Sequence, residues 1–225
     1  LWMAENLKVT HYNNGDQIPT DYENSDWAYL TTGAFSEYFG YNFTNIDENV
    51  EFNGLLYNWY VASDYRNVCP EGWSVPTDDD WMSLINYLGG SSEAGGKLKS
   101  TNVGWYQNGT WFPPNSGATN ESGFSALPSG FRYAITGTPE NDGIMGNMGA
   151  IAFLWSSTEY IHETLGATMG WMQQLGYDYS SSNHNYYFKQ YGGSIRCLAD
   201  EIYEGCTDPN SCNYDETANV DDGTC

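Results

Sequence analysis

The chain has 225 residues, of which 29 are acidic and 7 are basic, so its formal net charge is −22 at pH 7. Nucleic acid and anionic membrane surfaces repel a chain with this charge, which excludes both as partners. No stretch approaches the ~18 consecutive apolar residues of a membrane span, while a hydrophobic content of 40% is sufficient for a folded core.

The first part of the chain is predicted to contain one strand and one long loop. Residues 1–12 alternate partially between apolar and polar side chains, which is typical of a strand. Residues 13–50 are rich in Asn, Asp, Gly and Tyr, and we predict a surface excursion there. Residues 51–62 form an apolar element whose type the pattern does not settle.

The clearest predicted helix covers residues 78–88. Thr77 is a suitable N-cap, and Asp80 three residues later completes a capping box. An apolar stripe follows at i, i+3, i+4 and i+7, consisting of Trp81, Leu84, Ile85 and Leu88. Gly89 and Gly90 end the helix. The aspartates at 78–80 favour the positive end of the helix dipole, so we do not interpret them as catalytic groups.

The second half of the chain is predicted to form short strands. Residues 105–112 resemble a hairpin with Asn108–Gly109 as its turn. Other strand-like segments are 124–127, 130–133, 151–157, 186–188 and 194–198. One good helix, many short strands and long loops indicate an α+β domain.

The five cysteines form two sets. Cys69 and Cys197 each lie in a core-like sequence, whereas Cys206, Cys212 and Cys225 lie in the last 20 residues. Because there is no CxxC and the histidines are scattered, disulfides in an oxidising compartment are a better interpretation than zinc. Sequence alone does not fix the pairing. In the tail we predict Cys206–Cys225, with Cys212 free or paired outside this chain.

The composition changes near residue 203, which predicts a domain at 1–203 and a small unit at 204–225. The small unit is too poor in apolar residues to bury a core, so it needs a disulfide or a metal. Its hard oxygen ligands suit calcium, the one cofactor we predict; they are Asp208, Asn210, Asp215, Asn219, Asp221 and Asp222. Their spacing differs from that of an EF-hand, and an acidic, disulfide-stapled linker is the alternative.

Several segments resemble the Fibrobacter succinogenes major paralogous domain family, in order over about residues 1–200. They are 2–7 (WMAENL), 56–60 (LYNWY), 69–77 (CPEGWSVPT), 95–99 (GGKLK), 123–128 (GFSALP), 154–159 (LWSSTE) and 194–197 (SIRC). The resemblance implies secreted or surface-attached bacterial proteins with a C-type lectin-like fold, a twisted antiparallel sheet with flanking helices and long loops. It also implies that Cys69 and Cys197 form a buried disulfide. Residues 205–225 are similar to short Cys/Asp repeats of bacterial surface proteins.

The chemistry of related folds does not transfer to this chain. Calcium-dependent lectins use a Glu-Pro-Asn or Gln-Pro-Asp tripeptide, but residues 139–142 read Pro-Glu-Asn-Asp. Formylglycine-generating enzymes need reactive cysteines, and a disulfide leaves none. The chain also has no nucleophile elbow, no phosphate-binding glycine loop and no metal-spaced histidine pair. We therefore predict that it is not an enzyme, although only spatial separation can decide on a pair of hydrolytic carboxylates.

Two sets of surface residues are predicted. Asn42, Asn108 and Asn120 begin glycosylation sequons, in a number that chance alone produces. Aromatic residues flank the expected hairpin turn at Trp105, Tyr106, Trp111 and Phe112, and tyrosines cluster late at 177, 179, 186, 187 and 191. Aromatic side chains suit sugar stacking or a subunit interface when exposed, and core packing when buried.

These features predict a non-enzymatic, extracellular or cell-surface structural or adhesion module that assembles with copies of itself. Residues 1–10 or 205–225 would add to the sheet edge of a neighbour, and head-to-tail contacts that do not close give a filament. The alternative is a carbohydrate-binding module that uses aromatic loops to bind glycans. An enzyme of unknown reaction, with carboxylates in a deep pocket, is the third hypothesis.

Overall fold

The computed structural model describes residues 1–38, 46–105, 109–164, 166–201, 204–215, 218 and 220–225. Its helices are α1 (Asn24–Trp27), α2 (Ile46–Asn53), α3 (Trp59–Ala62), α4 (Asp78–Tyr87), α5 (Ser91–Leu98) and the 3-10 turn η1 (Pro139–Asn141). No helix in this part of the chain is both long enough and apolar enough to cross a membrane.

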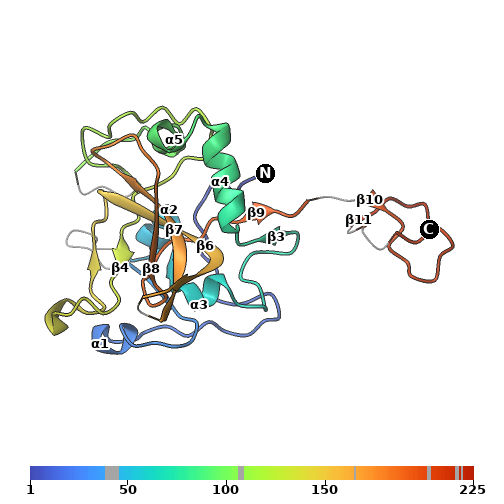
Figure 1. The fold of residues 1–225 in the computed structure, drawn as a ribbon, viewed down its shortest axis with the longest axis horizontal. Coiled ribbons are helices and arrows are strands. Elements are labelled where there is room, and N and C mark those ends of the chain that lie inside the picture. Colours follow the sequence, from blue (N-terminus) through green and yellow to red (C-terminus); the bar gives the residue numbers. More distant parts are fainter. Residues whose placement is uncertain (39–45, 106–108, 165, 202–203, 216–217, 219) are drawn as a thin grey trace.

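The strands form small sheets, so the chain has the mixed α+β character that the sequence predicts. The main sheet has the antiparallel order β6 (Ile151–His162), β7 (Ala167–Gly176) and β8 (Asn183–Phe188). Three antiparallel pairs surround it: β1 (Phe35–Ser36) with β2 (Leu56–Tyr57), β3 (Trp73–Ser74) with β9 (Leu198–Ala199), and β4 (Phe131–Arg132) with β5 (Met145–Gly146). In the tail, β10 (Glu204–Gly205) pairs in parallel with β11 (Val220–Asp221). Figure 1 shows the tail apart from the body.

Helix α4 confirms the sequence prediction in detail. The Thr77 side chain accepts a hydrogen bond from the backbone N–H of Asp80, and the Asp80 carboxylate accepts one from the backbone N–H of Thr77. Trp81 and Ile85 are buried on the apolar stripe. The positive φ angles of Gly89 and Gly90, 99° and 91°, end the helix.

Helix α5 was not predicted, because its sequence contains two consecutive glycines. Both glycines are required by packing. A Cβ at Gly95 would collide with the backbone of Ser181, and a Cβ at Gly96 would collide with the backbone of Gly117. Their absent side chains let these loops lie directly on the helix, and the backbone N–H of Gly96 donates to the carbonyl of Ser180 at 2.8 Å.

Two predictions for the first 50 residues were wrong. Residues 1–12 form no strand, because they bond at single points to the last core segment: Met3 N–H donates to the Cys197 carbonyl and Leu7 N–H to the Ile195 carbonyl. Residues 13–50 are not only a surface excursion, because Ile18, Trp27 and Phe35 are buried among the described positions. The buried residues of this segment are single apolar side chains far apart in the sequence, so a search for hydrophobic periodicity does not detect them.

The predicted hairpin at 105–112 lies partly outside the described residues, which omit 106–108. Trp111 forms a single parallel bridge with Val103, and its backbone N–H donates to the Asn102 carbonyl at 3.0 Å. Trp111 therefore pairs with a residue that precedes the predicted hairpin. The expected turn residue Asn108 lies outside the described residues.

The later strand predictions held in part. The segments 130–133, 151–157 and 186–188 contain or lie within β4, β6 and β8. Segment 124–127 makes only an isolated bridge at Ala126, and in segment 194–198 only Leu198 belongs to a strand, β9. Strands β5 and β7 were not predicted.

The interior consists of two hydrophobic clusters. One surrounds the disulfide between Cys69 and Cys197, which joins positions 128 residues apart with an S–S distance of 2.05 Å, and it includes Tyr57, Trp155 and Met172. The other lies between α4, α5 and the main sheet; its largest members are Trp81, Leu98, Trp111, Phe124 and Leu154. The second disulfide, Cys206–Cys225, closes the tail, and Cys212 is exposed and outside both disulfides.

Candidate functional site

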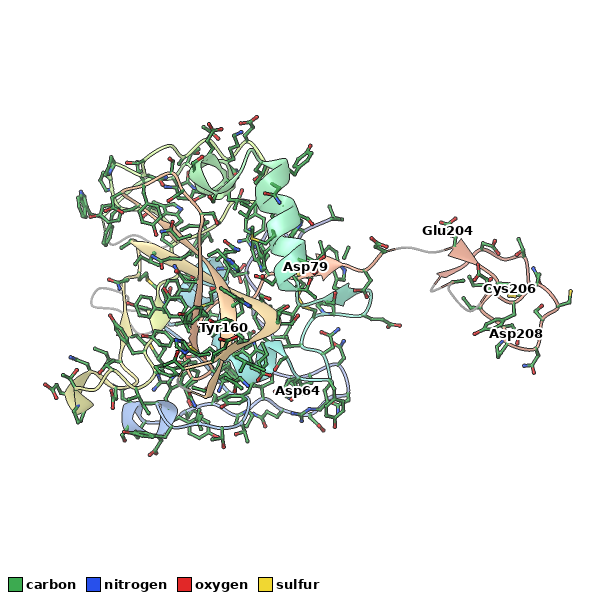
Figure 2. The ribbon with its side chains drawn as sticks, viewed as in Figure 1. Asp64, Asp79, Tyr160, Glu204, Cys206 and Asp208 are labelled. Carbon is green, nitrogen blue, oxygen red and sulfur yellow. A yellow bond between two sulfur atoms is a disulfide. The ribbon has the colours of Figure 1, made fainter. Side chains whose placement is uncertain are left out.

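Aromatic side chains from all three strands of the main sheet gather on one of its faces. They are Tyr160 and His162 of β6, Trp171 of β7, and His184 and Tyr186 of β8; we call this set the aromatic face. Trp171 pairs in register with Tyr186, and Gln173 pairs with His184, which places these side chains on the same side of the sheet. Figure 2 shows Tyr160 near the middle of the body, on the main sheet.

The rings of the aromatic face pack on one another. Tyr160 stacks on Tyr186 with centroids 4.2 Å apart, and Trp171 stacks on His184 at 4.1 Å. Tyr160 and Trp171 join the two pairs at 4.8 Å. Such contacts stabilise aromatic pairs beyond their burial. The rings nevertheless remain partly exposed, and Tyr186 keeps 38% of its surface.

The opposite face of the same sheet belongs to the core. A Cβ at Gly170 would collide with the indole of Trp59, and Met172 is fully buried. The aromatic face lies on the other side of the sheet, where its rings are partly exposed while Met169 and Gln173 beside them are buried.

Helix α4 supplies a polar anchor for the aromatic face. The Asp78 carboxylate lies 2.6 Å from Nε2 of His184, and the backbone N–H of Asp78 donates to Oγ1 of Thr158 in β6 at 3.0 Å. These bonds fix the imidazole flat against Trp171. Burial raises the pKa of the Tyr160 hydroxyl, and the neighbouring Tyr186 raises it further, so the Tyr160 phenol is neutral at physiological pH.

The structure separates the four aromatic residues that the sequence places around residue 108. Trp111 is fully buried, and its indole N–H donates to the Ala126 carbonyl at 3.0 Å, so its predicted surface role was wrong. Trp105 is 58% exposed and lies 4.9 Å from the half-buried ring of Phe112. Tyr106 lies outside the described residues. Among the tyrosines between residues 177 and 191, Tyr186 is exposed, whereas Tyr177, Tyr179, Tyr187 and Tyr191 are half-buried.

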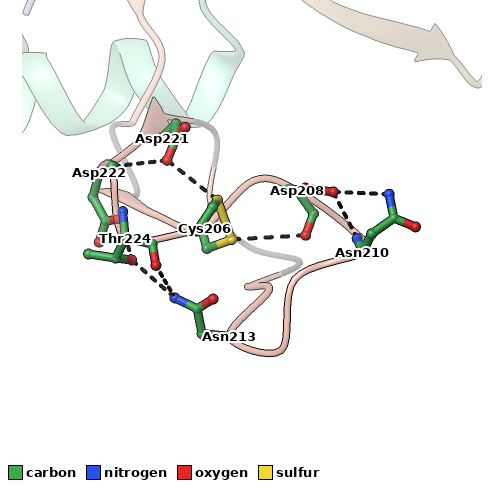
Figure 3. The surroundings of a disulfide bond; sticks show 9 residues. Cys206, Asp208, Asn210, Asn213, Asp221, Asp222 and Thr224 are labelled. Atoms are coloured by element: carbon green, nitrogen blue, oxygen red, sulfur yellow. Dashed lines mark hydrogen bonds between the residues drawn. A yellow bond between two sulfur atoms is a disulfide. The ribbon is translucent and has the colours of Figure 1, made fainter.

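The predicted calcium ligands of the tail occupy separate turns. Asp208 accepts from the backbone N–H of Asn210, Asp221 from that of Gly223, and Asp222 from that of Thr224 (Figure 3). Asp215 follows the bridge at Tyr214, and Asn219 lies outside the described residues. In the portion of the chain that is described, no three His, Cys, Asp or Glu side chains come together as a metal-binding group.

Only one of the three sequons lies within the described residues. Asn42 and Asn108 fall outside them. Asn120 is half-buried in a turn with a φ angle of 52°; its Nδ2 donates to Oγ of Ser125 at 2.8 Å, and its Oδ1 accepts from the Ser125 backbone. The nitrogen that would carry a glycan is therefore engaged in the fold.

Three buried cations were not predicted. Lys99 donates to the carbonyls of Ser116, Gly176 and Tyr179 at 2.7–2.9 Å. Arg196 donates to Oδ1 of Asn6 and to the Phe124 carbonyl. Arg132 donates to neutral oxygens as well. Within the described residues, none of the three has a carboxylate within 4 Å.

Several of the buried residues lie in the segments that resemble a known family. Trp59, Cys69, Lys99, Trp155 and Arg196 all belong to those segments, and all are buried. Residues 1–199 match the family model of the Fibrobacter succinogenes major domain. The chain belongs to this family. Neither the comparison with curated proteins nor the comparison with solved structures found a match.

The segments that carry the resemblance to the Fibrobacter succinogenes major domain therefore contribute part of the core. The aromatic face lies outside them: Tyr160, Trp171 and Tyr186 belong to no segment that carries the resemblance. A signal for this face does exist in the sequence, because His184, Tyr186 and Phe188 alternate along one strand and Tyr160 and His162 alternate along another.

Proposed function

We propose that this protein is a non-catalytic, extracellular structural or adhesion module of the C-type lectin-like superfamily, and that it assembles with copies of itself. The observation that carries the proposal is the partly exposed aromatic face on the main sheet. Tyr and Trp are enriched at protein interfaces, because they combine a large apolar area with a polar tip and few rotatable bonds.

The packing of the rings favours a protein partner. Tyr160 and Tyr186 cover one another, as do Trp171 and His184. Stacked rings present edges, hydroxyls and ring nitrogens outward, and these suit the mixed apolar and polar surface of another folded chain.

A head-to-tail contact joins two different surfaces, and the chain offers a second one in the tail. The N-terminal segment is a poor candidate for strand exchange, because it is bonded to its own body: Ala199 N–H donates to the Leu1 carbonyl, and Leu55 N–H donates to the Leu7 carbonyl. The tail closed by Cys206–Cys225 is the better donor, and the two disulfides support an oxidising, extracellular setting.

Sedimentation of the full chain over a concentration series tests the proposal. We expect the wild type to associate reversibly and Tyr186→Ala to weaken association at least tenfold, as at an interface hot spot. Tyr65→Ala is the matched control, because Tyr65 is 94% exposed and lies outside the aromatic face. A wild type that is monomeric at every concentration, or a Tyr186→Ala variant that assembles normally, contradicts the proposal.

A second candidate function is carbohydrate binding, which one observation favours. Trp105 is 58% exposed, and its ring leans on Phe112 with an interplanar angle of 33°. A broad aromatic ring supported in this way suits stacking against the C–H face of a sugar. A glycan array with and without calcium tests this idea: binding lost in Trp105→Ala but retained in Tyr29→Ala supports it, and the absence of any glycan signal refutes it.

A further inference from the structure

A pocket of about 260 Å³ lies between segments that the aromatic face does not include. Its walls are residues 20–24, which lead into the first residue of α1, with Ser36 and Glu37 at β1, Arg132 of β4 and Met145 of β5. The volume is just below the ~300–1,000 Å³ of sites for drug-sized ligands, so a matching occupant is smaller.

Arg132 places a buried positive charge in the pocket wall. Its side chain is almost fully buried, and its guanidinium lies 4.4 Å from the centroid of the Trp27 ring. Nη2 donates to the Tyr22 carbonyl at 2.8 Å and to Oδ1 of Asn24 at 3.1 Å, and Nη1 donates to Oγ of Ser36 at 3.2 Å. All three acceptors line the pocket, so the charged end of Arg132 faces it.

No carboxylate in the described part of the chain forms an ion pair with Arg132. Nε donates to the Gly143 carbonyl, which leaves one of the two Nη1 hydrogens without an acceptor there. Arg66 shows the contrast, because it contacts both oxygens of Asp64 at 2.9 and 2.7 Å. A buried cation with a spare N–H in a pocket wall favours an anionic group, and guanidinium binds carboxylates well.

Carboxylates at the same pocket restrict what that anion can be. Asp21 and Glu23 are exposed at the lining, and Glu23 lies close enough to act electrostatically on Arg132. These groups repel a simple anion, and they attract an ammonium group. A ligand that matches both charges carries a carboxylate and an ammonium a short distance apart.

We propose that this pocket binds a free α-amino acid, with its carboxylate against Nη1 of Arg132 and its ammonium against Asp21 and Glu23. Met145 supplies apolar wall for the side chain. The site is independent of the proposed self-assembly, because none of its residues belongs to the aromatic face.

Calorimetric titration of the full chain with each of the twenty standard amino acids tests the proposal, with acetate and methylammonium as single-charge probes. We expect at least one amino acid to bind at millimolar concentration or below, and acetate and methylammonium to bind at least tenfold more weakly. If no amino acid binds, or acetate alone binds equally well, the proposal is wrong.

A charge-matched pair of double variants locates the binding. Asp21→Asn with Glu23→Gln removes the two exposed carboxylates of the lining and leaves the half-buried Glu37, and Glu71→Gln with Glu121→Gln removes two exposed carboxylates elsewhere. The first double variant should weaken binding about tenfold or more while its melting temperature stays close to that of the second. Equal affinity of the two variants would overturn the assignment to this pocket. Arg132→Lys keeps the positive charge but removes the guanidinium group. It should also weaken binding, provided that thermal unfolding shows that the variant is folded.

Discussion

At the scale of single residues, the interior of this acidic chain relies on cations that neutral oxygens satisfy. Lys99 is the clearest case, because its ammonium group donates to three backbone carbonyls and has no exposed surface. The three carbonyls come from two loops and from the end of β7. One side chain thus joins segments up to 80 residues apart in the chain, which explains why a charged residue lies in the core.

Lys99 should give the stability of the protein a measurable pH dependence. Burial lowers the pKa of its ammonium group from 10.5 to about 8. Between these values the unfolded chain binds the extra proton, so the free energy of unfolding rises with pH. Relative to Lys99→Met, the wild type should gain about 3 kcal/mol between pH 8 and 10.5. Tyrosines with raised pKa values occur in both proteins, so their effect cancels in urea titrations of the pair. A difference that stays constant or shrinks over this range contradicts the expectation.

Truncation of the two tryptophans near residue 108 should destabilise the protein to very different extents. Trp111→Ala removes a fully buried ring and a hydrogen bond to Ala126, so we expect a loss of about 3–5 kcal/mol in unfolding free energy. Trp105→Ala removes a ring that is 58% exposed, and should cost less than about 1 kcal/mol. Chemical denaturation followed by far-UV circular dichroism compares them. Similar losses of unfolding free energy in both variants would contradict the placement of Trp111 in the core and Trp105 at the surface.

Composition cannot distinguish these two residues. Both are tryptophans that flank the same polar turn, and each suits a surface or a core. Their separation depends on the parallel bridge between Val103 and Trp111, which turns Trp111 inward against Ala126. That contact depends on the rest of the fold, so no local pattern predicts it.

At the scale of elements, the predictable parts are those that local chemistry specifies. Helix α4 carries its own start and stop signals in Thr77, Asp80, Gly89 and Gly90, and its bounds follow from them. The N-terminal segment has only partial alternation, and bonds to Cys197 and Ile195 decide its conformation. Helix α5 forms despite Gly95 and Gly96 because neighbouring loops pack directly against these glycines and bond to the helix backbone.

Removing the cap of α4 tests whether local chemistry also stabilises this helix. Thr77→Ala loses the side-chain acceptor for the Asp80 N–H, and we expect a cost of about 1 kcal/mol. Asp79→Asn, in the same turn but outside the capping box, is the control. Urea unfolding monitored at 222 nm measures both changes. A Thr77→Ala variant as stable as the wild type would mean that packing of Trp81 and Ile85 alone holds the helix.

At the scale of the whole molecule, the two disulfides act on different units. Cys69–Cys197 closes a loop of 128 residues around the core, whereas Cys206–Cys225 closes only the tail. Replacing Cys69 and Cys197 by serine should lower the unfolding free energy by about 5 kcal/mol on the loop-entropy estimate. Replacing Cys206 and Cys225 should leave the body unchanged. Tryptophan fluorescence separates the cases, because the tail contains no tryptophan; equal effects on that signal would contradict independent units.

The candidate site depends on how three strands are arranged in the whole molecule, which is why the sequence did not reveal it. The aromatic face exists only when the register of β6, β7 and β8 brings Tyr160, Trp171 and Tyr186 together. Alternation within β6 and β8 indicates that each strand has an aromatic side. Strand β7 lies between them, and its mixture of glycine, methionine and glutamine shows no clear period. Because the sequence does not predict β7, it does not show that the aromatic sides of β6 and β8 lie on the same face of one sheet.

The net charge of −22 gives the proposed self-assembly a distinctive salt dependence. Copies of the chain repel one another, and the repulsion extends over ~30 Å at 0.01 M salt but only ~8 Å at 0.15 M. The aromatic face itself contains no carboxylate, lysine or arginine, and Asp78 and Glu163 are the acidic groups that act on its rings, so its own contacts change little with salt.

Association should therefore strengthen when sodium chloride is raised from 0.01 to 0.3 M, as measured by light scattering at fixed protein concentration. Tyr186→Ala should scatter as a monomer at both concentrations, which separates specific contact from salting out. Association that weakens with salt would mean that attractive ion pairs join the copies. In that case the contact would lie at charged residues and not at the aromatic face.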